Sequence, residues 1–210
     1  MKEAITSIEA HQRILRNFSL GYELWISFVT DAEKVPAKDV EWTAQYGTRL
    51  LSYQRQDRKQ RGHPTAVATS VRVLGAPHSR ELILMATPLA LSTHPSSHWQ
   101  KQRWNQRPPE CGDYFMVREP RTRRDYAWTW RVKEQELNKL SARMTTLVKA
   151  GNAAALRSEL EVWTRVFVMH RGVRQQFARL LTSAQKLWHV CHFSPWPGIQ
   201  PGALPFITKF

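Results

Sequence analysis

Apolar positions in the first half of the chain repeat with helical and with strand-like periods, and the two patterns alternate. Apolar side chains at every third or fourth position predict an amphipathic helix over 3–18. The segment 22–30, YELWISFVT, is aromatic and β-branched with little polar interruption, which predicts a central strand. A helical spacing over 39–60, with an aspartate at its N-cap, is followed by two strands at 65–74 and 80–87.

In the middle of the chain, prolines and turns separate shorter predicted elements. A short helix is expected at 96–104, ended by consecutive prolines, and strands are expected at 113–118 and 126–132. In the last of these strands, alternation puts four large side chains on one face, namely Tyr126, Trp128, Trp130 and Val132. We expect this face to pack into the core rather than to stack on bases. The turn between the two strands, 120–125, carries arginines that cannot be core.

Three apolar stripes at helical spacing follow, and the last is the clearest. Gly151 fits the end of the first helix and Asn152 the N-cap of the second. The third helix has an apolar arc formed by Val173, Phe177, Leu180, Leu181, Ala184 and Trp188. Its opposite half holds Arg171, Arg174, Arg179 and Lys186, and no acidic residue occurs after Glu161.

The order of these elements predicts an α+β fold with a ferredoxin-like βαββαβ N-terminal part, an extra hairpin strand and a three-helix C-terminal part. The expected parts are an α/β nucleic-acid-binding part over 1–132, a helical bundle over 133–192 and an extended tail over 193–210. RNA-recognition modules, CRISPR repeat-processing proteins and rolling-circle initiators share this topology, but topology alone assigns no activity. The chain lacks a His-x-His pair on the strand at 80–87 and an aromatic RNP-type strand with a glycine-rich flank.

The net charge of the chain indicates which kind of partner it binds. The chain has 31 Lys and Arg against 17 Asp and Glu, a net charge of +14, and a pI near 10.4. A surface of this kind binds polyanions by releasing their condensed counterions. A generally basic protein, or one that touches anionic lipid, is the plainer alternative. With 42% hydrophobic residues and nine tryptophans, the chain can also bury a sizeable core.

The candidate nucleic-acid-binding residues form four groups, because arginine forks match phosphate oxygens and exposed tryptophans stack on bases. The first group ends the helix at 39–60: Arg55, Arg58, Lys59 and Arg61. The second interleaves cations with tryptophans: Trp99, Lys101, Arg103, Trp104 and Arg107. The third surrounds the hairpin tip: Arg118, Arg121, Arg123 and Arg124. The fourth is the basic half of the last helix, Arg171, Arg174, Arg179 and Lys186.

Sequence motifs for catalysis and cofactors are weak. The chain has no phosphate-binding glycine loop and no clustered carboxylates for a two-metal nuclease. The spaced pairs His94/His98 and His189/His192 lack the further ligands that zinc requires, so we expect no metal and no cofactor. Metal-independent RNA cleavage would use His63 or Tyr53 as the base, although an exposed loop histidine is the simpler interpretation of His63.

Two cysteines exclude a disulfide framework, and neither a signal-peptide core nor a membrane span of roughly 18 apolar residues is present. We therefore expect a cytoplasmic protein. The preferred function is a non-catalytic, sequence-tolerant subunit of a larger nucleoprotein assembly that binds RNA or single-stranded DNA, together with other protein subunits and without a membrane. The alternatives are a metal-independent RNA-processing endonuclease of an RNA-guided, CRISPR-type system, and a protein-interaction subunit without nucleic acid.

Overall fold

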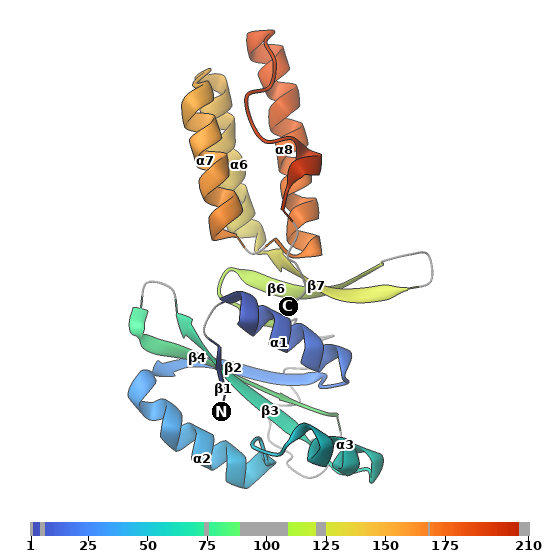
Figure 1. The fold of residues 1–210 in the computed structure, drawn as a ribbon. Coiled ribbons are helices and arrows are strands. Elements are labelled where there is room, and N and C mark those ends of the chain that lie inside the picture. The colour runs from blue at the N-terminus through green and yellow to red at the C-terminus, as the bar shows by residue number, and fades with distance from the viewer. Residues whose placement is uncertain are drawn as a thin grey trace. The chain divides into compact units, whose positions relative to one another are not determined.

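The protein is a mixed α+β chain with largely antiparallel sheets, and its contacts divide it into two compact units, residues 1–112 and 113–210 (Figure 1). The computed structural model describes residues 2–4, 7–73, 76–88, 109–120, 125–167 and 169–205. The predicted helix at 96–104 and the tip arginines at 121–124 therefore lie outside the described residues.

The first unit is built on a four-stranded sheet with the order β1-β3-β4-β2. In chain order its elements are β1 (Lys2–Ala4), α1 (Ser7–Ser19), β2 (Leu24–Asp31), the 3-10 turn η1 (Ala32–Lys34), α2 (Val35–Tyr46), α3 (Ser52–Gln60), β3 (Ala66–Val73), β4 (Ala76–Ala86) and β5 (Glu110–Cys111). β1 runs parallel to β3, whereas β4 pairs antiparallel with both β3 and β2.

Two helices cover opposite faces of this sheet (Figure 1). On one face, Trp42 of α2 packs in a buried cluster with strand residues such as Leu24 and Leu84. Because neighbouring strand residues point to opposite faces, Trp25 and Ile83 belong to the other face, and both are buried. Helix α1 contacts β3 and buries a stripe of side chains one helical turn apart, Ala10, Ile14 and Phe18.

The single helix expected over 39–60 is wrong, because the chain folds into two helices with a turn between them. Gly47 ends α2 in the left-handed conformation, with a φ of 65°, and its N–H donates to the carbonyl oxygen of Thr43 at 2.9 Å. A glycine adopts this conformation without the steric cost that a Cβ would add. The expected N-cap, Asp39, instead lies inside α2 and is buried.

The ferredoxin-like order is not confirmed. The strand predicted at 113–118 is β6 (Tyr114–Pro120), and it belongs to a second sheet with the order β5-β6-β7. The fourth strand of the first sheet is β1, from a segment that the sequence assigned to a helix. The short hydrophobic pattern of 113–118 specifies a strand, but its partner is chosen by tertiary packing.

The second unit joins the β6–β7 hairpin to helices. Its elements after β6 are β7 (Tyr126–Val132), α6 (Glu134–Lys149), α7 (Ala153–Val166), α8 (Arg171–His192) and the 3-10 turn η2 (Pro201–Ala203). The hairpin groups with the helices rather than ending the first part at residue 132, because β7 packs on α8. Gln176 of α8 holds both backbone groups of Val132, accepting from its N–H at 2.9 Å and donating to its oxygen at 3.0 Å.

Close packing at the start of α8 requires Gly172. Its backbone N–H donates to the hydroxyl of Thr129 at 2.9 Å, and an added Cβ would lie 2.5 Å from the carbonyl oxygen of Trp130. The predicted apolar arc of α8 is largely confirmed, since all of its residues are buried except Leu180, which is half-buried. The predicted caps are also present, because Asn152 accepts from the N–H of Ala155 at 2.9 Å and Gly151 has a φ of 66°.

The large side chains of β7 become less exposed from the hairpin tip toward the helices. Tyr126 is 55% exposed and Trp128 is half-buried, whereas Trp130 and Val132 are 0% exposed. Thr129 on the other face is buried as well. The expectation of one core-facing side is therefore right for the base of the strand and wrong for its outer end, where Tyr126 is exposed.

Candidate nucleic-acid interface

The cations of α3 have different roles. Arg58 and Arg61 are exposed, and Arg61 pairs with Asp57 at 3.0 Å. Lys59 is half-buried: its ammonium donates to the carbonyl oxygen of Leu20 at 2.6 Å and lies 3.9 Å from the centroid of the Tyr22 ring. Burial, with a smaller contribution from the charge of Arg55, lowers the pKa of Lys59. Lys59 therefore anchors α3 to the end of α1.

Arg55 lines a hollow of about 860 Å³ in the first unit, together with three arginines that were not among the predicted site residues. Arg13 and Arg16 come from α1, and Arg49 comes from the turn between α2 and α3. The rest of the lining mixes polar or small residues, Asn17, Thr48, Ser52, Ala68 and Thr69, with the apolar residues Leu20, Leu50 and Val67. We call this hollow, defined by Arg13, Arg16, Arg49 and Arg55, the arginine hollow.

Three of the four arginines are held in place by neighbours within the unit. Arg49 donates to a single oxygen of Asp39 through Nε at 3.1 Å and Nη2 at 2.6 Å. Arg13 pairs with Glu9 one helical turn earlier, and Arg55 donates to the carbonyl oxygen of Leu50. Each of these contacts orients a guanidinium before any ligand arrives.

Among the described residues that line the arginine hollow, Asp39 is the only acid. Its side chain is 8% exposed, whereas that of Arg49 is 61% exposed. Burial alone would favour the protonated acid, but hydrogen bonds and nearby positive charge, including those of Arg49, hold the pKa of Asp39 below its usual value. The acid therefore stays ionised and neutralises one arginine, so that the lining remains net positive.

Arg16 differs from the other three, because it is exposed and makes no side-chain ion pair or hydrogen bond with the described residues. Beside it, α3 starts at Ser52 after Leu51, whose side chain cannot cap the helix. The first N–H groups of a helix carry partial positive charge, which adds to the potential of the arginines. Sequence could have placed Arg13 and Arg16 on one helix by their spacing, but it could not place Arg49 and Arg55 beside them.

The catalytic candidates are solvent-facing. Tyr53 on α3 is 67% exposed, and His63 is exposed in the segment after α3, where its backbone N–H donates to the oxygen of Arg58 at 2.8 Å. Neither side chain lines the arginine hollow. Among the described residues, no group of three or more His, Cys, Asp or Glu could hold a metal ion.

The structure places only part of the other predicted groups. Arg118 is exposed on β6, with its guanidinium 5.8 Å from the centroid of the Tyr126 ring. The remaining members of the second and third groups lie outside the described residues: Trp99, Lys101, Arg103, Trp104, Arg107, Arg121, Arg123 and Arg124.

On the basic half of α8, two of the four cations are half-buried and two are exposed. Arg171 is half-buried and ties α8 to the hairpin, donating to the backbone oxygens of Pro120 at 3.0 Å and Glu119 at 3.3 Å. Arg174 is also half-buried, and burial lowers its pKa. Arg179 and Lys186 are exposed and have no ion pair or side-chain hydrogen bond with the described residues. Among the four cations of this half of α8, Arg179 and Lys186 are the exposed ones.

His192, near the end of α8, is in contact with a neighbouring ring and with the backbone of α6. The ring of His192 lies 4.4 Å from that of Trp188, and its Nε2 is 2.6 Å from the carbonyl oxygen of Val148. Cys191 beside it is exposed, whereas Cys111 is buried. None of the described helices combines the length and apolar character needed to span a bilayer.

Comparison with known proteins gives no family assignment. Neither the family models, nor the curated proteins, nor the solved structures contain a match to this chain.

Proposed function

We propose that this protein binds RNA or single-stranded DNA through the arginine hollow, as a non-catalytic, cytoplasmic subunit of a larger nucleoprotein assembly. The observation that carries the proposal is the convergence of four arginines, Arg13, Arg16, Arg49 and Arg55, on one hollow whose described lining contains a single acid. These residues come from three separate segments of the chain, so their proximity is a property of the fold rather than of local composition.

Phosphate is the ligand group that best matches this lining. A guanidinium offers a planar fork of donors that fits two phosphate oxygens, and it stays charged at any physiological pH. Because Arg13, Arg49 and Arg55 are already oriented by Glu9, Asp39 and Leu50, less side-chain entropy is lost when a ligand binds. The exposed Arg16 can close on the ligand from the rim.

A single strand fits the arginine hollow better than a duplex. Its volume of about 860 Å³ accommodates a nucleotide, but the half-buried guanidinium of Arg13 is recessed from the surface. A flexible strand can turn a phosphate and its sugar into such a recess, whereas duplex phosphates stay on a stiff outer surface. The neutral donors and acceptors of Asn17, Thr48 and Ser52 suit a sugar or base edge without imposing one sequence.

Reversing the charge of Arg16 is the most direct test. Because this side chain makes no ion pair with the described residues, Arg16→Glu should leave the fold intact while placing a negative charge at the phosphate site. Fluorescence anisotropy with a labelled mixed-sequence RNA should show affinity weakened by about tenfold or more at low salt, a loss near 1.4 kcal/mol.

Arg165→Glu is the matched control, since it makes the same change in net charge on the exposed side of α7. We expect it to change affinity by less than about twofold. Equal losses in both variants would show that only total charge matters. No binding to RNA or single-stranded DNA at low salt would refute the proposed function altogether.

Whether the protein also cleaves RNA can be tested separately from binding. The alternative, a metal-independent RNA-processing endonuclease, would have Tyr53 or His63 act from positions that do not line the arginine hollow. Incubating labelled RNA with the protein in EDTA should leave the RNA intact. Specific cleavage that is lost in His63→Ala or Tyr53→Phe would favour the endonuclease instead.

A further inference from the structure

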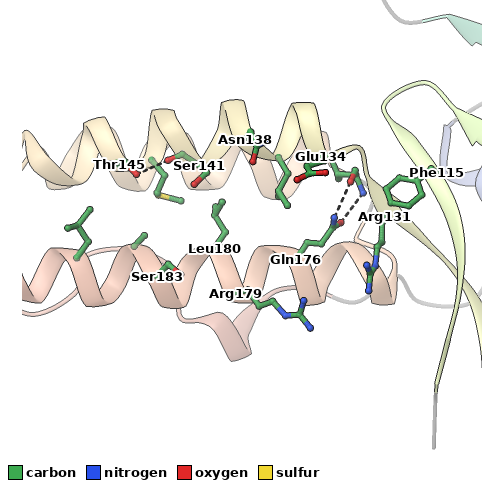
Figure 2. Close-up of a pocket in the computed structure, with 15 residues that line it drawn as sticks. Phe115, Arg131, Glu134, Asn138, Ser141, Thr145, Gln176, Arg179, Leu180 and Ser183 are labelled. Carbon is green, nitrogen blue, oxygen red and sulfur yellow. Dashed lines mark hydrogen bonds between the residues drawn. The ribbon is translucent and has the colours of Figure 1, made fainter.

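A second surface feature lies in the second unit, between α6 and α8. The two helices flank a cavity of about 540 Å³, with side chains from both directed into the space between them (Figure 2). Its apolar lining includes Leu137 and Met144 from α6 and Leu180 and Leu187 from α8. We call it the α6/α8 groove.

The α6/α8 groove is not filled by α7. That helix packs elsewhere on α8, where the ring of Phe177 lies 6.2 Å from that of Trp163 and 5.2 Å from that of Phe167. Phe177 does not line the groove. The three leucines that do, Leu137, Leu180 and Leu187, are only half-buried, whereas Phe177 and Trp163 in the contact between α7 and α8 are buried. An apolar strip thus remains partly open to solvent.

The two edges of the α6/α8 groove differ in charge. On the α8 side, Arg179 and Ser183 line the groove, and Lys186 follows Ser183 by three residues on the same stripe of the helix. Both cations are exposed and have no ion pair with the described residues, and α8 contains no acid. On the α6 side the lining is mainly neutral, with Asn138, Ser141 and Thr145, and Glu134 lies at one end (Figure 2).

We propose that the α6/α8 groove binds an amphipathic helix of a partner protein, with its apolar face in the groove and acidic residues along the edge that faces α8. The groove-lining residues of α6 run from Glu134 to Thr145, a rise of about 16 Å, or three helical turns. A partner helix of that length presents apolar side chains at i, i+3 or i+4 and i+7, the spacing used in helix-in-groove recognition.

The apolar floor favours a protein helix over the other candidate occupants. A nucleic-acid strand would satisfy Arg179 and Lys186 but would leave Leu137, Leu180 and Leu187 in contact with water and phosphate. A second copy of this unit would bring further positive charge to the same edge, because residues 113–210 contain 16 Lys and Arg against 7 Asp and Glu. Complementary acids on a partner both neutralise that edge and set the direction of the helix.

The test uses displayed peptides of about 16 residues, with leucine fixed at i, i+4 and i+7 and the other positions randomised. Selection on the full-length protein should enrich Asp and Glu on one flank of the leucine face. The enriched peptides should bind the wild-type protein in anisotropy measurements. Ser183→Trp should weaken their binding about tenfold or more, because Ser183 is exposed and lines the groove, so that the tryptophan ring would occupy the space of the peptide. The double variant Arg179→Glu, Lys186→Glu should reverse the preference toward basic peptides.

Three outcomes would overturn the inference: no enrichment above that on Ser183→Trp, peptides without an acidic flank, or sedimentation showing a dimer that Ser183→Trp disrupts. Loss of RNA affinity in the Arg179→Glu, Lys186→Glu variant without peptide selection would assign this edge to nucleic acid instead. Arg165→Glu serves again as the control, because Arg165 is 81% exposed and lies 4.0 Å from Glu161, a weaker contact than the 2.6 Å pair between Arg143 and Glu159. The peptide measurements do not involve the arginine hollow. The inference about the α6/α8 groove can therefore fail while the proposed function stands, and the proposed function can fail while the inference stands.

Discussion

At the scale of single residues, identical side chains on one helix have different functions. Arg171 and Arg179 lie two turns apart on α8, and sequence places both on its basic half. Arg171 is committed to Glu119 and Pro120 of the hairpin, whereas Arg179 has no ion pair with the described residues. Sequence identifies cations that do not belong to a core, but only tertiary contacts decide which of them holds the fold together.

His170 gives a prediction about pH at the same scale. It is buried just before α8, with its ring 6.5 Å from that of Trp130, and burial lowers its pKa from 6.5 to about 4. Between these values the unfolded chain binds a proton that the folded protein does not. Stability from this residue is therefore fully present above about pH 6.5 and is lost as the pH falls toward 4, by about 2 kcal/mol between pH 7 and pH 5.

Denaturant unfolding of wild type and His170→Gln at both pH values measures this effect. The variant should lose less stability on acidification, although it starts from a lower value at pH 7. His63→Gln, in an exposed segment, should retain the wild-type pH dependence. A variant His170→Gln that loses as much stability as wild type would show that other groups cause the acid sensitivity.

At the scale of elements, the periodicity of apolar residues predicts that a helix or strand exists better than it predicts which other element it packs against. The strand at 126–132 and the apolar arc of α8 follow from alternation and helical spacing, because one buried face imposes those periods on the sequence. The pairing of β1 with β3 could not be predicted, since three residues are too few to show a period. The division of 39–60 into two helices depends on Gly47, whose left-handed conformation is a single-residue signal within a helical pattern.

The arginine hollow shows the same limit for a site. Arg55 was a sequence candidate because it lies in a run of cations, but Arg13 and Arg16 on α1 are more than thirty residues earlier. They meet Arg49 and Arg55 only because α1, the turn after α2, α3 and β3 all contribute to one hollow. A run of charge predicts a local patch, whereas this convergence requires the sheet order.

The hairpin strand β7 gives a prediction for an element that is buried at one end. Trp130 is 0% exposed, so Trp130→Ala should cost about 3–5 kcal/mol of unfolding free energy through lost burial and a cavity. Trp128, two residues nearer the tip, is half-buried and should cost roughly half as much. Thermal and urea unfolding measure both, and equal losses would contradict the gradient of burial along the strand.

At the scale of the whole molecule, the excess of cations is large, but individual cations have different roles. Of 31 Lys and Arg, several that sequence counted as ligand contacts are internal anchors, such as Lys59 and Arg171. Net charge attracts a polyanion from a distance and sets the encounter rate, while the oriented guanidiniums of the arginine hollow determine the bound state. These two contributions respond differently to salt and to single substitutions.

Salt dependence therefore tests the molecule as a whole. If the four arginines of the hollow each neutralise a phosphate, the logarithm of the association constant for a single strand should fall with the logarithm of salt concentration at a slope near −3, since each contact contributes about −0.7. Affinity would then drop roughly fiftyfold between about 50 and 200 mM salt.

Arg16→Ala should make the slope less steep by about 0.7, because one counterion-releasing contact is removed. Arg165→Ala, which removes a cation outside the hollow, should leave the slope unchanged while lowering the net charge equally. A wild-type slope near zero would exclude phosphate contacts as the source of affinity, and equal slopes in the two variants would show that the arginine hollow is not where the strand binds.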